Sequence, residues 1–343
     1  MLEIARRTRE IDGLDPECIP YAELLQSQQP AILKGVAKHW EIARRGEESA
    51  GAAIDYIASF DAGRPVVGYT GAPEIGGRFF YDADVTGLNF EARRVSLTEF
   101  LRRIEAHLND NDPPAFYIGS TDIELFLPAL SQENGLTLSD PMFESNLPTV
   151  SIWIGNRTIA TAHFDFSNNI ACSLVGRRRF LLFPPDQAAN LYPGPFHLTP
   201  GGQVVSMVDF RNPELDRYPR FRDAIAAAEV AELEPGDALF YPAMWWHHVE
   251  ALEPFNVMIN YWWNTTPAFI DTPMTTLLHA ILSLRDRPKP EKQAWRALFE
   301  HFVFGDPARA SEHLPEQARG ILAPLDEAGA RRLRAELLQR LNR

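Results

Sequence analysis

Two side chains of metal-binding type lie close together in the stretch ATAHFDFSNN, residues 160–169. They are His163 and Asp165, and a single phenylalanine separates them. On a β-strand, residues two apart project from the same face, so both side chains would enter the same side of a sheet. A buried carboxylate there needs a cation or strong hydrogen-bond donors, because burying an unpaired charge costs several kcal/mol. The pair is therefore a candidate for half of a metal site, although two ordinary polar residues on a strand would have the same spacing.

A third ligand should come from a distant strand with the same inward aspect. The segment LEPGDALFYPAMWWHHVEAL, residues 233–252, predicts a turn at PGD and then two strands, the second of which carries His247 and His248. Neighbouring residues on a strand face opposite ways, so one of the two histidines would face the metal, and the pattern alone does not choose between them. Two histidines and one carboxylate form the facial triad of non-haem Fe(II) oxygenases, and the same ligands also suit Mn or Zn.

An oxygenase of this kind needs an electron-donating co-substrate, commonly 2-oxoglutarate, whose distal carboxylate requires a cation. Three arginines enter the apolar strand of GRRRFLLFPP, residues 176–185. Alternation predicts that Arg178 faces opposite to Arg177 and Arg179. Arginines on strands usually lie on solvated faces, but one that turns inward would pair bidentately with a carboxylate.

Four more polar side chains lie on predicted strands near these motifs. Asn169 and Asn260 have apolar neighbours, and a buried amide must be hydrogen-bonded. Each would orient metal ligands or co-substrate, or would simply satisfy nearby backbone groups. Thr161 shares the predicted face of His163, which puts its hydroxyl near any bound anion, and Tyr117 supplies a further hydroxyl.

The elements around these motifs predict a β-rich core with helices on either side in the chain. Short strands fill residues 158–263, and amphipathic helices follow from about Thr272. Ser96, with Glu99 three residues later, predicts the N-cap of a helix over 96–108. Other helices are expected at 21–30 and 41–60, and strands at 113–119 and 149–155. This order favours an antiparallel β barrel or sandwich with flanking helices over a parallel α/β sheet.

Composition narrows the class of protein further. The net charge of −13 disfavours broad attraction to nucleic-acid phosphates, and the sequence has no apolar run long enough to span a membrane. The first residues lack the apolar core of a signal peptide. Cys18 and Cys172 form no CxxC pair, which suits a reducing compartment. We therefore expect a cytoplasmic globular protein that binds neither nucleic acid nor membrane.

Four blocks in order, TAHFD, NNIACSLVGRRRFLLFPPDQAANLYPGP, PGDALFYPAMWWHHVEAL and NYWW, resemble the JmjC-type, cupin-like 2-oxoglutarate oxygenases. Among these the chain is most similar to the asparaginyl hydroxylases. The resemblance implies a double-stranded β-helix within an oxygenase domain at residues 1–268, followed by a helical, dimerising region at 269–343. It implies that Fe(II) is bound by three residues, His163, Asp165 and His247. The residues that it implies around the co-substrate are Tyr117, Thr161, Asn169, Arg178, Asn260 and Trp262.

The resemblance implies an Fe(II)- and 2-oxoglutarate-dependent dioxygenase. Such an enzyme uses O2 to hydroxylate a C–H bond of a peptide, protein side chain or small molecule. The expected partners are 2-oxoglutarate, this prime substrate and a second copy of the chain. Two positions depart from the family pattern: Ala160 replaces a frequent threonine, and Arg178 replaces the usual lysine. The alternatives are another metal-dependent cupin enzyme of isomerase type, a non-catalytic cupin-type binding or sensor protein, and a structural dimer with a vestigial site.

Overall fold

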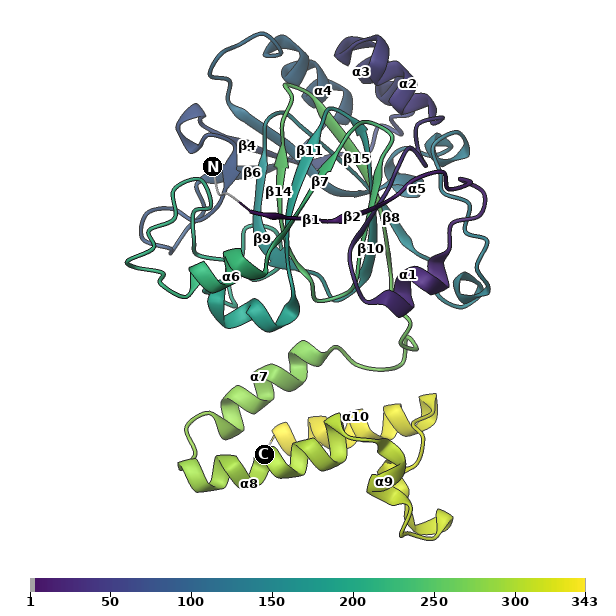
Figure 1. Ribbon diagram of the computed structural model, residues 1–343, viewed down its shortest axis with the longest axis vertical. Coiled ribbons are helices and arrows are strands. Elements are labelled where there is room, and N and C mark those ends of the chain that lie inside the picture. The colour runs from purple at the N-terminus through teal and green to yellow at the C-terminus, as the bar shows by residue number, and fades with distance from the viewer. Residues whose placement is uncertain (1–3, 343) are drawn as a thin grey trace. The chain divides into compact units, whose positions relative to one another are not determined.

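The computed structural model describes residues 4–342, which form two compact units that divide after Asn264. The first unit holds two β-sheets and their covering helices, and the second is helical (Figure 1). The boundary lies a few residues before the one that the sequence analysis places at 268/269.

Eight antiparallel strands, four from each sheet, form the centre of the first unit. In the smaller sheet the spatial order is β1 (Arg6–Arg7), β12 (Glu229–Leu233), β11 (Arg178–Phe183), β14 (Trp246–Ala251), β9 (Ile159–Phe164) and β5 (Arg78–Phe79). In the larger sheet it is β2 (Arg9–Ile11), β3 (Ala31–Leu33), β13 (Ala238–Tyr241), β10 (Asn168–Val175), β15 (Asn256–Trp263), β8 (Thr149–Gly155), β7 (Ala115–Asp122), β4 (Val66–Gly71) and β6 (Phe90–Val95). The two sets β12-β11-β14-β9 and β13-β10-β15-β8 are the facing sheets of a jelly roll, which confirms the expected double-stranded β-helix.

Helices lie at the outer faces of these sheets (Figure 1). Ser96 accepts a hydrogen bond from the backbone N–H of Glu99 (3.3 Å), so the predicted N-cap is confirmed. The expected helix over 41–60 is interrupted at Ser49, which caps the second of two short helices. The helices of the first unit are α1 (Tyr21–Ser27), α2 (Glu41–Glu48), α3 (Ala50–Ala58), α4 (Leu97–Ala106), α5 (Ile123–Phe126) and α6 (Phe221–Ala227).

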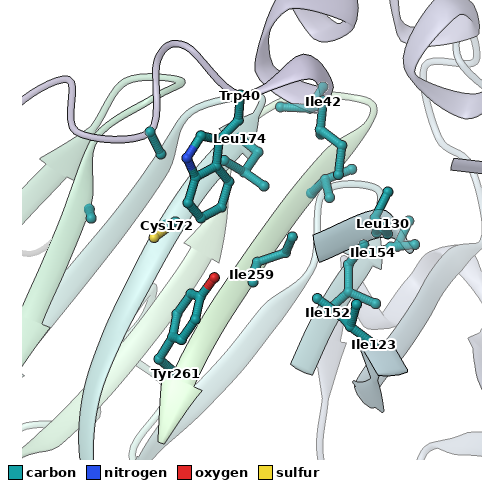
Figure 2. Close-up of a cluster of buried hydrophobic side chains, with 14 of the residues drawn as sticks. Trp40, Ile42, Ile123, Leu130, Ile152, Ile154, Cys172, Leu174, Ile259 and Tyr261 are labelled. Carbon is teal, nitrogen blue, oxygen red and sulfur yellow. The ribbon is translucent and has the colours of Figure 1, made fainter. Parts of the chain in front are cut away.

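Alternation along the larger sheet separates a helix-covered face from an inward face. Figure 2 shows Ile152 and Ile154 of β8 together with Ile259 and Tyr261 of β15 on the covered face, where helices α1–α5 contribute to the same core. The intervening residues of β15, such as Met258, point instead into the space between the two sheets. The candidate site lies in that space.

A buried carboxylate ties the PGD turn to the residues that follow β3. The Asp237 side chain is 5% exposed and accepts hydrogen bonds from Lys34 Nζ, from the Gly35 N–H (2.9 Å) and from the Glu234 N–H (3.1 Å). Removing it would leave the ammonium and two backbone donors without their partner. Each such group costs roughly 1–3 kcal/mol when it is left unsatisfied.

Asp237→Ala should therefore lower the free energy of unfolding by about 3 kcal/mol, the range seen when one member of a buried ion pair is removed. Urea denaturation of the full chain measures the change. Glu234→Ala, an exposed substitution in the same turn, is the matched control and should change the free energy by about 0.5 kcal/mol or less. A loss in Asp237→Ala no larger than in the control would contradict this role.

The second unit contains helices α7 (Pro273–Leu284), α8 (Lys289–Phe299), α9 (Pro307–Ser311) and α10 (Glu327–Leu341). Among the residues that the structure describes, no helix is long and apolar enough to cross a membrane.

Candidate metal centre

The predicted triad comes together on two adjacent strands of the smaller sheet. His163 on β9 pairs directly with His247 on β14, and Asp165 follows the end of β9. One ligand atom from each side chain lies within 4.8 Å of the others, and His247 Nε2 is 3.6 Å from Asp165 Oδ2. The N–H of Met244 donates to the carbonyl of Asp165 (2.8 Å) and ties this end of β9 to the segment that leads into β14. The arrangement is that of a mononuclear metal site with two nitrogen ligands and one carboxylate.

Backbone carbonyls orient both imidazole rings. His163 Nδ1 lies 2.8 Å from the carbonyl of Thr161, and His247 Nδ1 lies 3.1 Å from the carbonyl of Trp245. A carbonyl oxygen can only accept a hydrogen bond, so Nδ1 carries the proton and donates it, and Nε2 keeps its lone pair for a metal. Burial, reinforced by the neighbouring His163, lowers the pKa of His247 to about 4. The ring is therefore neutral at physiological pH, which is the form that binds metals.

The two adjacent histidines face opposite sides of β14. His248 stacks on Phe210, with ring centroids 4.5 Å apart, and its Nε2 lies 3.4 Å from Glu250 Oε1. It belongs to the outer face of the smaller sheet. Strand alternation did not decide which of the two histidines faces the metal, and the geometry shows that it is His247.

The three consecutive arginines divide as alternation predicts. Arg177 pairs with Glu253 (2.8 Å) and Arg179 pairs with Glu232 (2.9 Å), both on the outer face. Arg178 points inward and is 2% exposed, and its Nε and Nη2 have no hydrogen-bond partner. Burial lowers the pKa of Arg178 to about 10, so the side chain still carries its charge at neutral pH.

Burying a guanidinium without a counter-ion costs free energy, and an anionic ligand bound beside Arg178 would offset that cost. Arg178 lines a cavity of about 150 Å³ that also contains the triad. Fe(II) with an anionic co-substrate fits this donor set, because the cavity offers two imidazoles and a carboxylate to a metal and one unpaired cation to a carboxylate. Of the nine residues named from the sequence, eight line this cavity: His163, Asp165, His247, Tyr117, Asn169, Arg178, Asn260 and Trp262.

Two buried amides form a chain of hydrogen bonds along the cavity wall. Trp153 Nε1 donates to Asn260 Oδ1 (2.6 Å), and Asn260 Nδ2 donates to Asn169 Oδ1 (3.4 Å). Both asparagines are 1% exposed, so these bonds fix their amide orientation. Burial raises the pKa of Tyr117, so its hydroxyl remains a protonated donor beside Arg178. Trp262 Nε1 is a second donor, buried without a partner.

Comparison with known proteins identifies the family to which this arrangement belongs. The Cupin-like domain family matches residues 17–269, a stretch that contains the whole jelly roll and the triad. This chain belongs to the Cupin-like domain family, of JmjC type.

The relatives of this Cupin-like domain include HSPB1-associated protein 1 and proteins named as lysine-specific demethylases. HSPB1-associated protein 1 of Homo sapiens is 34% identical over 152 residues, 42% of this chain and 30% of that protein. Lysine-specific demethylase 8 of Xenopus tropicalis is 24% identical over 244 residues, 70% of this chain and 49% of that protein. Lysine-specific demethylase JMJ31 of Arabidopsis thaliana is 31% identical over 121 residues, 35% of this chain and 22% of that protein. The chain thus spans about half or less of each relative, and likeness to the asparaginyl hydroxylases stays a prediction.

One side chain of the Cupin-like domain lies elsewhere than alternation suggests. Ala160 lines the cavity of the triad, although alternation from His163 would turn it to the other face, and Thr161 lines a neighbouring cavity together with His163. The cause is a bulge in β9, because Val249 pairs with Ala160 while His247 pairs with His163. Between these pairs two residues of β9, 161 and 162, oppose one residue of β14, and the extra residue shifts the alternation by one. Thr161 and His163 still line one cavity, and the place of Thr161 near a bound anion stays a prediction.

Three further residues of this cavity escaped the sequence analysis. Tyr241 on β13 packs its ring 4.7 Å from that of His247, Trp153 binds Asn260, and Gln203 comes from the long connection between β11 and β12. Strand alternation could have placed Tyr241 inward, two residues after the buried Leu239. No local sequence pattern predicts that Gln203 lies in the site, because the position of this loop residue depends on the tertiary fold.

A larger cavity of the Cupin-like domain, about 500 Å³, lies on the outer face of the smaller sheet. Three of its arginines pair with acidic residues: Arg7 with Glu232 (3.4 Å), Arg179 with Glu250 (3.6 Å) and Arg211 with Asp209 (3.7 Å). Volume alone would favour this cavity. The smaller one is the better candidate site, because it combines the triad with a cation that lacks a partner.

Proposed function

We propose that this chain is an Fe(II)- and 2-oxoglutarate-dependent dioxygenase that hydroxylates a C–H bond of a peptide or protein side chain or of a small molecule. The observation that carries this proposal is the buried, unpaired Arg178 in the same cavity as a two-histidine, one-carboxylate triad. The overall reaction converts substrate C–H, O2 and 2-oxoglutarate into substrate C–OH, succinate and CO2.

The side chains of the cavity have separate tasks in this reaction. His163, Asp165 and His247 would hold Fe(II), which supplies the O2 chemistry when 2-oxoglutarate is bound beside it. Arg178 would hold the distal carboxylate of 2-oxoglutarate. Tyr117 lies beside this position and would donate a further hydrogen bond to it.

The rest of the cavity orients these groups and keeps water away. The chain from Trp153 through Asn260 to Asn169 holds the amides in place, and the jelly-roll core encloses the site. A rigid, dry pocket of this kind positions the reacting atoms without reorganisation at the time of reaction.

Turnover of 2-oxoglutarate in the absence of a prime substrate tests the proposal. The purified 343-residue chain with Fe(II), ascorbate, O2 and 2-oxoglutarate should form succinate, and the Asp165→Ala variant should form none above background. An isomerase-type cupin or a non-catalytic sensor would form no succinate in either case. Equal succinate formation by the variant would contradict the assignment of the triad.

The prime substrate is proposed only as a class. Two of the relatives are named as lysine-specific demethylases, which makes methylated lysine a second candidate beside hydroxylation of another side chain.

We also propose that the helical unit mediates homodimerisation. Its described residues bury few apolar side chains, and many large ones are exposed, including Leu282 (79%), Phe304 (72%) and Leu338 (56%). Exposed apolar surface on this scale favours a partner, and a second copy of the chain is the simplest one.

The double variant Leu282→Asp/Leu338→Asp should convert the protein from a dimer to a monomer, because charges placed in an apolar interface lose their hydration. Light scattering measures the mass, and the matched double variant Arg285→Asp/Arg340→Asp changes exposed polar positions of the same helical unit. A monomeric wild type, or a dimer that survives Leu282→Asp/Leu338→Asp, would contradict this proposal.

A further inference from the structure

A second cavity adjoins the metal centre, and we call it the aromatic cavity. It has a volume of about 130 Å³ and shares His163, Tyr117, Trp153 and Gln203 with the cavity of the triad. The two spaces are therefore neighbours, and His163 lies in the wall of both. Arg178 does not line the aromatic cavity. A group bound there would lie next to the metal centre and leave the space beside Arg178 free for the co-substrate.

Aromatic side chains from several strands form much of the wall of this cavity. They are Tyr69 on β4, Phe79 on β5, Phe90 on β6, Tyr117 on β7 and Trp153 on β8. Aliphatic atoms come from Ile159, Ala160 and Val205. The cavity thus offers a mainly apolar surface, which stabilises an apolar group by removing it from water.

The aromatic cavity has no formal charge in its wall. None of its described lining residues is Asp, Glu, Lys or Arg, and its polar side-chain groups are a few hydroxyls, one amide, the His163 imidazole and the Trp153 indole N–H, which donates to Asn260. Burial raises the pKa of Tyr69 and of Tyr117, so neither phenol supplies a negative charge at neutral pH. A charged side chain that entered this space would lose hydration without gaining a counter-ion, at a cost of several kcal/mol.

The arrangement of the rings also argues against a cage for a methylated ammonium. Phe79 stacks on Tyr117 with centroids 5.7 Å apart, and Phe90 lies 5.2 Å from Phe79 and 5.6 Å from Tyr69. Rings at these separations touch one another. They form one continuous wall, whereas a cage surrounds the cation with rings that stand apart on several sides.

We propose that the aromatic cavity receives the substrate group that is hydroxylated, and that this group is uncharged and apolar, an aliphatic or aromatic side chain. This inference rests on the proposed function and specifies its substrate class. The volume is well below the roughly 300–1,000 Å³ of sites for drug-sized ligands, so the cavity takes a single side chain or a group of that size. A lysine, methylated or not, is disfavoured by the same wall.

Two probes of nearly the same shape test the charge preference directly. They are 3,3-dimethylbutan-1-ol, which is neutral, and choline, in which a quaternary nitrogen replaces the quaternary carbon. Ligand-observed NMR on the full chain, loaded with Zn(II) and 2-oxoglutarate, measures the binding of each. The neutral alcohol should bind at least about tenfold more tightly than choline.

Variants of the cavity wall locate the binding. Val205→Trp should fill the cavity and abolish binding of the alcohol, while 2-oxoglutarate binding stays within about twofold of wild type. Phe90→Glu, at a half-buried position that tolerates a charge, should reverse the preference in favour of choline. Leu125→Trp, an exposed position on α5 outside the described lining of the cavity, is the control and should behave as wild type.

Choline binding as tight as that of the alcohol, no binding of the alcohol, or alcohol binding that survives both Val205→Trp and Phe90→Glu would overturn the inference. If the wild-type protein did not bind 2-oxoglutarate at all, that result would instead refute the proposed function. The two failures are therefore distinguishable, because the co-substrate is titrated separately from the probes.

Discussion

Arg178→Met should weaken the binding of 2-oxoglutarate to the metal-loaded protein by roughly thirtyfold or more. Loss of one partner of a buried, charge-assisted pair costs about 2–5 kcal/mol. The same variant should leave the ligand-free protein at least as stable as wild type, because it replaces a buried cation that lacks a partner with an apolar side chain of similar length. Isothermal calorimetry and thermal unfolding measure the two effects.

Matched substitutions in the same strand separate the role of Arg178 from a general effect of charge. Arg179→Met removes a cation from the outer face, where it pairs with Glu232, and should leave 2-oxoglutarate affinity unchanged. Arg178→Lys keeps the charge but loses the bidentate geometry, so its affinity should lie between those of wild type and Arg178→Met. Unchanged 2-oxoglutarate affinity in Arg178→Met would refute the assignment of this residue.

Asp165→Ala and His247→Ala should each reduce metal affinity by more than about a hundredfold, because even changes outside the ligand sphere cost 10–100-fold. Turnover of 2-oxoglutarate should fall to background in both variants. Both side chains offer a ligand atom to the same metal position, and a metal held by only two of the three ligands is bound more weakly. Metal titration followed by calorimetry, with succinate as the second readout, measures the effect.

The neighbouring histidine is the control for this prediction. His248→Phe removes an imidazole one residue away, on the opposite face of β14, and keeps an aromatic ring against Phe210. It should retain the metal and the turnover. Loss of metal in His248→Phe together with retention in His247→Ala would reverse the assignment of the two histidines.

Much of the site could be predicted from the sequence, because strand alternation is a local property. Alternation predicts that Arg178 faces opposite to Arg177 and Arg179, and burial and ion pairing show that Arg178 is the one that points inward. The amides Asn169 and Asn260 stood out as polar residues in apolar strands, and both line the cavity. The helical tail and the antiparallel core were also expected from hydrophobic spacing.

The features of the site that the sequence could not predict depend on contacts between elements far apart in the chain. Ala160 lines the triad cavity because of a bulge in β9, which shows itself only in the pairing with β14. Alternation alone could not choose between His247 and His248, because the choice depends on which face of β14 meets the other sheet; the family resemblance implied His247, which lies with His163 and Asp165. Gln203 and the rings of the aromatic cavity come from elements far apart in the chain, so no spacing in the sequence connects them.

An anaerobic titration of 2-oxoglutarate into metal-free and Fe(II)-loaded protein tests the central claim most directly. If one cavity holds both the metal and the co-substrate, 2-oxoglutarate should bind the loaded protein with one-to-one stoichiometry and at least about tenfold more tightly than the metal-free protein. Equal affinity with and without metal, or no binding to the loaded protein, would contradict the claim that the triad and Arg178 form a single site.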